Sequence, residues 1–296
     1  MRKHIWFLLI AHIFFFLLLT GCGGTKPGYT ASGYVLSPSG NTGVPGVTLD
    51  FGGDFGIAKT NEYGIWGKTS LTGGVTITPT EPGWLFDPLN YSVSANENGI
   101  TFKVYQYFDD FSDSTSCWDV GESPAVQIGY ENNQYKMSIL ANESACHTRS
   151  PFPHTDSYQV QVSAVTAAGS GAEYGVVFNH NGSWNSYHWI LRIKPDTQEY
   201  AVSKRINIGG TVTLDNVIAW TTSANINASG ANILKVTQNG SQFSIYLNDP
   251  DNAVASGTLD TTHAVDVYAG LLARAYSSSP VHVYFDDYQV TDLSPR

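Results

Sequence analysis

The sequence predicts an all-β protein made of two β-sandwiches. Beyond residue 22, no stretch places apolar residues at i, i+3, i+4 and i+7, whereas apolar and polar residues alternate with period two along much of the chain. Segments 158–162, 187–193 and 243–247 show this alternation. Asn239-Gly240 stands just before the last of them and is a preferred dipeptide of tight hairpin turns. Only 14% of the residues are charged, which suits sheets with polar, uncharged faces.

The first residues predict export and lipid anchoring. A basic start, Met1-Arg2-Lys3, precedes an apolar run that is too short to span a bilayer, so residues 1–21 have the form of a signal peptide. Leu19-Thr20-Gly21-Cys22 resembles the lipobox of bacterial lipoproteins, which implies a diacylglycerol on Cys22 and a tether over residues 22–28. The alternative is an ordinary signal peptide followed by a chance cysteine. Gly23 after the lipidated cysteine favours the outer membrane in a Gram-negative organism.

The charge balance excludes two classes of partner. The chain has 15 basic and 25 acidic residues, and loss of residues 1–21 removes two of the basic ones, so the mature net charge is −12. An acidic chain without a basic run is not expected to bind nucleic acid or anionic membrane surfaces. The membrane partner is therefore expected through the lipid alone.

Residues 29–104 form the first predicted sandwich, and the pattern changes near residues 104–107. Its glycine-rich motifs are Gly33-Tyr34-Val35, segments 43–49, 60–66 and 73–79, and Pro82-Gly83-Trp84-Leu85-Phe86-Asp87-Pro88. On these motifs the segment resembles the carboxypeptidase regulatory-like family of small transthyretin-like sandwiches, which implies a non-catalytic spacer or accessory module.

Residues 105–296 form the second, larger sandwich. Its strand-like segments, in order, are 108–112, 174–178, 232–236 with the Asn239-Gly240 turn, and 284–290. This ordered set is similar to the concanavalin-A-like, laminin-G-like jelly rolls, including the keto-disaccharide hydrolase-like branch. The resemblance implies that the first and last strands are neighbours.

The number of cysteines in the chain, three, predicts one disulfide. With Cys22 used for lipid, Cys117 and Cys146 remain, and an even remainder in an exported chain favours a disulfide between them. Two free thiols are the alternative.

Two Asp-Asp pairs are candidates for a structural calcium ion. Asp109-Asp110 lies near the start of the jelly roll and Asp286-Asp287 near its end, so strand neighbourhood would bring them together. Calcium prefers oxygen ligands. The alternative is that these aspartates cap turns or accept backbone N–H hydrogen bonds. No other cofactor is indicated.

No catalytic motif is present in the sequence. The glucanase branch of this fold carries its acids as Glu-x-Asp-x-Glu on one strand, and this chain has no such pattern. It also has no Gly-x-Ser-x-Gly elbow and no His-Glu-x-x-His spacing. We expect the histidines after the signal peptide to be exposed polar residues.

Carbohydrate binding is the function that the residues favour. Segment 179–188 joins polar amides and aromatic rings at a turn, the residue types that contact sugars. If Tyr187, Trp189, Leu191 and Ile193 face the core, His188 and Arg192 point to the opposite side. Trp184 would then lie at the loop tip, unless it folds back as a lid over the core.

The leading hypothesis is therefore a lipid-anchored, non-catalytic carbohydrate-binding or adhesion protein of the cell envelope. The expected site residues are Trp184, His188 and Arg192. The alternatives are a glycan-active hydrolase of the keto-disaccharide hydrolase-like branch and a purely structural envelope protein.

Overall fold

The computed structural model describes residues 27–166, 171–183, 187–208, 211–260, 266–277 and 279–294. They form strands, turns and two short 3-10 helices, η1 (Gly53–Phe55) and η2 (Pro195–Thr197), and there is no α-helix among them. The predicted all-β class is confirmed. No helix in this described part has the length and apolar character needed to cross a membrane.

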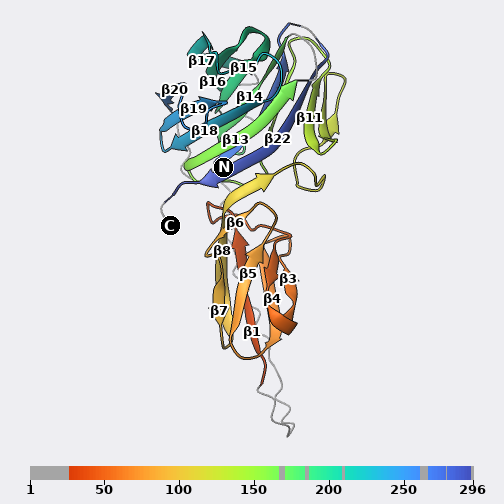
Figure 1. Ribbon diagram of the computed structural model, residues 1–296, viewed down its shortest axis with the longest axis vertical. Helices are drawn as coiled ribbons and strands as arrows, with labels where there is room; N and C mark the ends of the chain where they lie inside the picture. The colour runs from red at the N-terminus through yellow and green to blue at the C-terminus, as the bar shows by residue number, and fades with distance from the viewer. Residues whose placement is uncertain are drawn as a thin grey trace, which may run out of the picture.

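The first eight strands form a small sandwich, drawn in red to yellow in Figure 1. One sheet contains β4, β1, β8 and β6, and the other has the order β3-β2-β5-β7. Trp66 joins the two layers, because its ring lies 5.9 Å from that of Phe51 and 6.3 Å from that of Phe102. The strands are β1 (Tyr29–Leu36), β2 (Thr48–Asp50), β3 (Ile57–Lys59), β4 (Ile65–Leu71), β5 (Val75–Thr80), β6 (Leu85–Asp87), β7 (Tyr91–Val93) and β8 (Glu97–Asp109).

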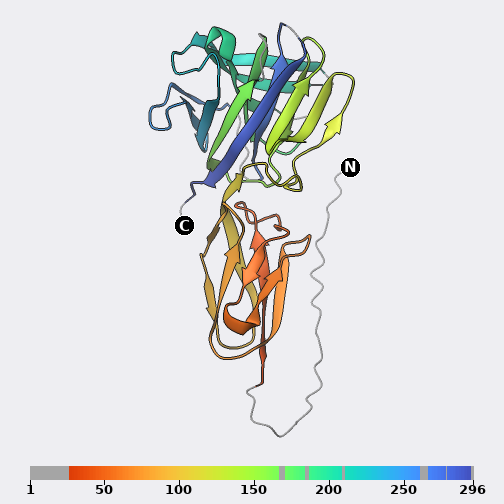
Figure 2. The same ribbon diagram turned by 45° about the vertical axis from the view of Figure 1, so that its right-hand side comes forward.

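Strand β8 runs through the boundary predicted between residues 104 and 105. Its first part pairs in parallel with β1, and its last residues, 106–109, pair antiparallel with β22. Figures 1 and 2 both show this strand leaving the lower sandwich and entering the upper one. The two parts are thus joined by a continuous strand and not by a separate linker.

The remaining strands form the larger sandwich. One layer follows the order β20-β19-β18-β13-β22-β11-β10-β9, and the other is a six-stranded sheet of order β12-β21-β14-β15-β16-β17. The strands of the first layer are β9 (Gly121–Glu122), β10 (Val126–Glu131), β11 (Gln134–Ile139), β13 (Ser157–Thr166), β18 (Asn232–Asn239), β19 (Gln242–Leu247), β20 (Ala255–Thr258) and β22 (Val281–Asp292). Those of the six-stranded sheet are β12 (Ala145–Arg149), β14 (Ala172–His180), β15 (His188–Lys194), β16 (Glu199–Ile208), β17 (Thr211–Thr222) and β21 (Tyr268–Ala275).

Aromatic side chains fill the space between these layers. Phe178 of the six-stranded sheet lies 5.6 Å from Phe243 of the opposite layer, measured between ring centroids. The hairpin predicted at Asn239-Gly240 is confirmed, because β18 and β19 are paired there and Gly240 has φ +56°. Adjacency of the first and last strands of this sandwich is also confirmed, with Asp109 opposite Tyr288.

Candidate functional site

The six-stranded sheet is buried on both faces around β14 and β15. Trp189, Leu191 and Ile193 point into the main core, as the alternation predicts. Ile190 lies on the opposite face, where it packs with Val177 and Leu272 in a separate small apolar cluster. We call this opposite face, which points away from the other layer of the sandwich, the outer face.

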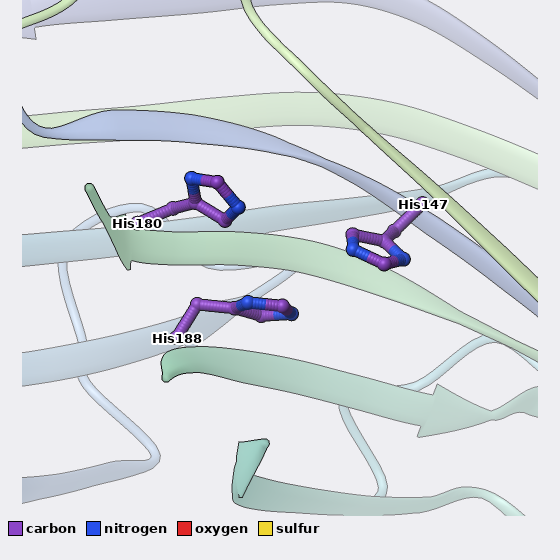
Figure 3. A group of neighbouring side chains, drawn as sticks. All are labelled: His147, His180 and His188. Carbon is purple, nitrogen blue, oxygen red and sulfur yellow. The ribbon is translucent and has the colours of Figure 1, made fainter. Parts of the chain in front are cut away.

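Three histidines from three strands meet on the outer face. His147 lies in β12, His180 ends β14 and His188 begins β15. The His188 ring lies 4.9 Å from the His147 ring and 4.9 Å from the His180 ring, measured between centroids. One ring nitrogen from each residue can be chosen so that all three lie within 4.8 Å of one another. Figure 3 shows the three rings pointing toward a common centre. We call these three residues the histidine cluster.

A bulge in β14 turns His180 onto the outer face. Strict alternation would direct His180 into the core with Phe178, but the register between β14 and β21 shifts between Val177 and His180. Asn179 is the extra residue, with φ +50°, and its backbone N–H donates to the Tyr158 hydroxyl at 2.9 Å. Asparagine tolerates this left-handed conformation better than most residues. The residue after the bulge therefore points outward.

Two of the three histidines of the cluster have lowered pKa values. Burial lowers the pKa of His188 to about 2, with further lowering by the neighbouring His147, His180 and Arg205. Burial and the charge of Arg205 also lower the pKa of His147 to about 3. His188 is fully buried, and neither of its ring nitrogens has a hydrogen-bond partner among the described residues.

Arginines gather on the same sheet. All four arginines in the described part of the chain lie on its strands, and no other strand carries one. Arg205 is the strand partner of His188. The Arg149 guanidinium lies 4.6 Å from the Tyr268 ring centroid and donates to the Gly182 carbonyl at 3.0 Å. The outer face is therefore locally basic although the chain is acidic.

Arg192 is the centre of a buried polar network. Its guanidinium donates to Glu173 Oε1 at 2.5 Å, to the Ser203 hydroxyl at 2.5 Å and to Asn216 Oδ1 at 2.8 Å. The same group lies 5.0 Å from the ring centroid of Trp220, which is half-buried. Hydrogen-bonding groups and an aromatic ring thus lie together beside the exposed edge strand β17.

Two of the expected site residues, His188 and Arg192, lie on the outer face but are buried in it. His188 and Arg192 point away from the main core, as predicted, but both are buried. Tyr187 is 39% exposed and does not join the core. Trp184 lies outside the described residues. The expectation of exposed histidines is wrong for His154, His180 and His188, which are buried. The spacing of histidines in the sequence does not reveal which strands become neighbours.

The aspartate pairs act mainly as hydrogen-bond acceptors. Asp109 is buried and accepts from the Tyr107 hydroxyl, the Phe111 backbone N–H and the Trp118 indole at 2.7–2.9 Å. Asp110 accepts from the backbone of Ser112. In the second pair, Asp286 accepts from the Gln134 side chain at 3.2 Å and from the backbone N–H of Asp287 at 2.9 Å. Among the described residues, the histidine cluster is the one group that brings together three possible metal ligands. Asp109, Asp110 and Asp286 thus accept hydrogen bonds from neighbouring side chains and backbone, and a calcium ion at the two aspartate pairs stays a prediction.

The expected disulfide is not formed. Cys117 and Cys146 are both free thiols. Cys117 lies in the exposed loop after β8, where its thiol donates to the Thr115 carbonyl, whereas Cys146 lies in β12 and is half-buried. Burial, with a contribution from Asp119, raises the pKa of the Cys146 thiol to about 11. An even cysteine count does not place two cysteines in bonding geometry.

A cleft of about 440 Å³ lies where the two sandwiches meet. Its wall includes Trp84, Tyr107, Phe108 and Phe152. Trp84 is held there by an indole hydrogen bond to the Phe108 carbonyl at 3.1 Å and by edge-on contacts with Tyr107 and Phe152. These rings pack mainly on one another and connect the two sandwiches.

Comparisons with known proteins find structural similarity without sequence similarity. No family model and no curated protein matches the chain. Among solved structures, a Crh5 transglycosylase in complex with NAG is 11% identical with a TM-score of 0.46, over 64% of this chain and 85% of that one. A β-glucanase of Bacillus licheniformis is 10% identical with a TM-score of 0.46, over 63% and 98%. The carbohydrate-binding module CBM66 of Bacillus subtilis is 13% identical with a TM-score of 0.41, over 64% and 96%.

Proposed function

We propose that this chain is a non-catalytic glycan-binding protein of the bacterial envelope, anchored through lipid on Cys22. In this proposal the first sandwich is a stalk and the second is the binding head. The ligand lies on the outer face of the six-stranded sheet, between the Arg192 network and the edge strand β17.

The observation that carries this proposal is the network around Arg192 beside Trp220. Glycan recognition needs planar hydrogen-bonding groups for hydroxyls and an aromatic face for the C–H side of a sugar ring. Asn216 and Trp220 both belong to β17, and Arg192 contacts both. The hydrogen bonds of Arg192 to Glu173 and Ser203 hold its guanidinium in place, so the site is positioned before the ligand arrives.

The charge of the outer face favours glycans that carry carboxylate or sulfate groups. Arg149, Arg205 and Arg274 are half-buried on this sheet. They make it a basic region of a chain that is acidic as a whole. Arginine forms paired hydrogen bonds with planar anions.

A glycan array with neutral and acidic glycans tests the proposal on the mature chain. We expect retention of acidic glycans, and loss of that retention in Trp220→Ala. Tyr63→Ala is the matched control, because Tyr63 is a 65% exposed aromatic residue on the first sandwich. Absence of glycan retention, or equal retention by Trp220→Ala and the parent chain, would overturn the proposal. Release of shorter products from a bound glycan would favour the hydrolase alternative.

A further inference from the structure

We propose that His147, His180 and His188 form a binding site for a divalent transition metal ion, with Zn²⁺ as the ion. The site is independent of glycan binding. It would occupy the outer face at the end of β14 and the start of β15, opposite β12 (Figure 3).

The distances between the rings fit this assignment. Zinc binds imidazole nitrogens at about 2.0–2.1 Å, so two ligands of a tetrahedral ion lie about 3.3 Å apart. The three ring nitrogens already lie within 4.8 Å of one another. Side-chain rotations that bring each nitrogen inward by about an ångström would complete the geometry without a change in the backbone.

The backbone holds the three residues in place. The three positions belong to strands of a single sheet, and β21 connects β12 to β14 by antiparallel pairing. The bulge at Asn179 is needed for the convergence, since it directs His180 to the side of His188. Ligands on paired strands are positioned more accurately than ligands on loops.

His188 supplies a second, independent observation. It is fully buried, its ring lies 4.9 Å from each of the His147 and His180 rings, and neither of its nitrogens has a hydrogen-bond partner in the described part of the chain. A buried polar group without a partner is destabilising, and native structures seldom retain one without a reason. A metal–nitrogen bond would satisfy one of the two ring nitrogens.

The donor set selects the class of ion. Three imidazoles suit zinc and its neighbours in the first transition row, whereas calcium and magnesium require oxygen ligands. Three protein ligands leave a fourth position open for water or an anion. The positive charge of Arg205 beside the cluster favours an anion there.

Zinc titration of the mature chain tests the site. The protein is made without a polyhistidine tag, stripped with a chelator, exchanged into metal-free buffer and titrated calorimetrically. Metal content is measured after dialysis. We expect one Zn²⁺ per chain, a rise in melting temperature with zinc concentration, and visible bands of tetrahedral Co²⁺ when cobalt replaces zinc.

Single variants assign the ligands. His188→Ala and His180→Ala should each weaken zinc binding by at least about 100-fold, the upper end of effects seen when a supporting residue of a metal site is lost. His154→Ala is the matched control, because His154 is another buried histidine but packs on Tyr158, away from the histidine cluster. It should bind zinc like the parent chain.

Two outcomes would overturn the site. The first is that the parent chain takes up no zinc, and this measurement does not depend on any variant. The other is an equal loss of affinity in His188→Ala and His154→Ala, which would mean that binding depends on general stability. If His188→Ala does not fold, His188→Gln replaces it, with the same expected loss. Glycan binding is measured separately, so failure of one proposal does not decide the other.

Discussion

Glu173 and Arg192 form an ion pair that is almost completely removed from solvent. Glu173 Oε1 lies 2.5 Å from Arg192 Nη1, and the two side chains are 2% and 4% exposed. Arg274 approaches the second carboxylate oxygen at 3.8 Å. Because a buried charge needs a counter-charge, each of the two residues depends on the other.

Replacement of Glu173 by Gln should destabilise the protein strongly. The change leaves the guanidinium of Arg192 buried without its anion, and loss of one partner of a buried pair costs about 3–5 kcal/mol. Urea unfolding of the two proteins measures the difference.

Glu131→Gln provides the control for this change. Glu131 pairs with Lys136 at 2.9 Å on the surface, where solvent screens the attraction, so little change is expected. The double variant Glu173→Gln/Arg192→Met should recover part of the lost stability, because the unpaired charge is then gone. Equal effects of Glu173→Gln and Glu131→Gln would contradict the buried pair.

His154 should make the protein sensitive to acid. The residue is fully buried, and burial lowers its pKa from 6.5 to about 3. Below pH 6.5 the unfolded chain takes up a proton on this ring and the folded chain does not, so the free energy of unfolding falls with pH. The loss is about 1.4 kcal/mol per pH unit until the pH reaches the folded pKa.

The variant His154→Gln isolates this contribution. Urea unfolding at several pH values between 7 and about 4 should give a slope that is shallower by about 1.4 kcal/mol per pH unit than that of the parent chain. Ser150 and Tyr158, which face the ring, stay uncharged in this range, and burial raises the pKa of Tyr158. An unchanged slope would show that His154 titrates normally.

The two thiols of the larger sandwich should react at different rates. Cys117 is exposed and should be modified quickly by a thiol reagent. Cys146 is half-buried with a pKa raised to about 11, so its reactive thiolate is scarce at neutral pH and it should react slowly. Cys117→Ser and Cys146→Ser assign the two phases. A folded protein with no reactive thiol until reductant is added would contradict the free cysteines.

We expect lipid anchoring to depend on Cys22. Its replacement by Ala should abolish labelling with a palmitate analogue and leave an uncleaved or soluble product. Cys117→Ala should retain the label and the membrane fraction. Normal processing and membrane retention of the Cys22→Ala protein would rule out this anchor.

The sequence by itself determined the features that depend on neighbours along the chain. Period-two alternation is a property of a single strand, and it correctly predicted the all-β class and the opposed directions of Trp189 and His188. The Asn239-Gly240 turn was predictable because a tight hairpin needs residues that tolerate positive φ. The direction of Arg192 followed from the same alternation.

The tertiary structure alone decided what these side chains meet. Alternation sends His188 and Arg192 to the outer face but does not show that His147 and Glu173, from other strands, lie beside them there. The order of strands in a sheet is set by long-range pairing and packing, and the position of His180 depends on a one-residue bulge that breaks its own alternation. Periodicity in the sequence encodes the direction of a side chain, whereas its partners come from strands that only folding brings together.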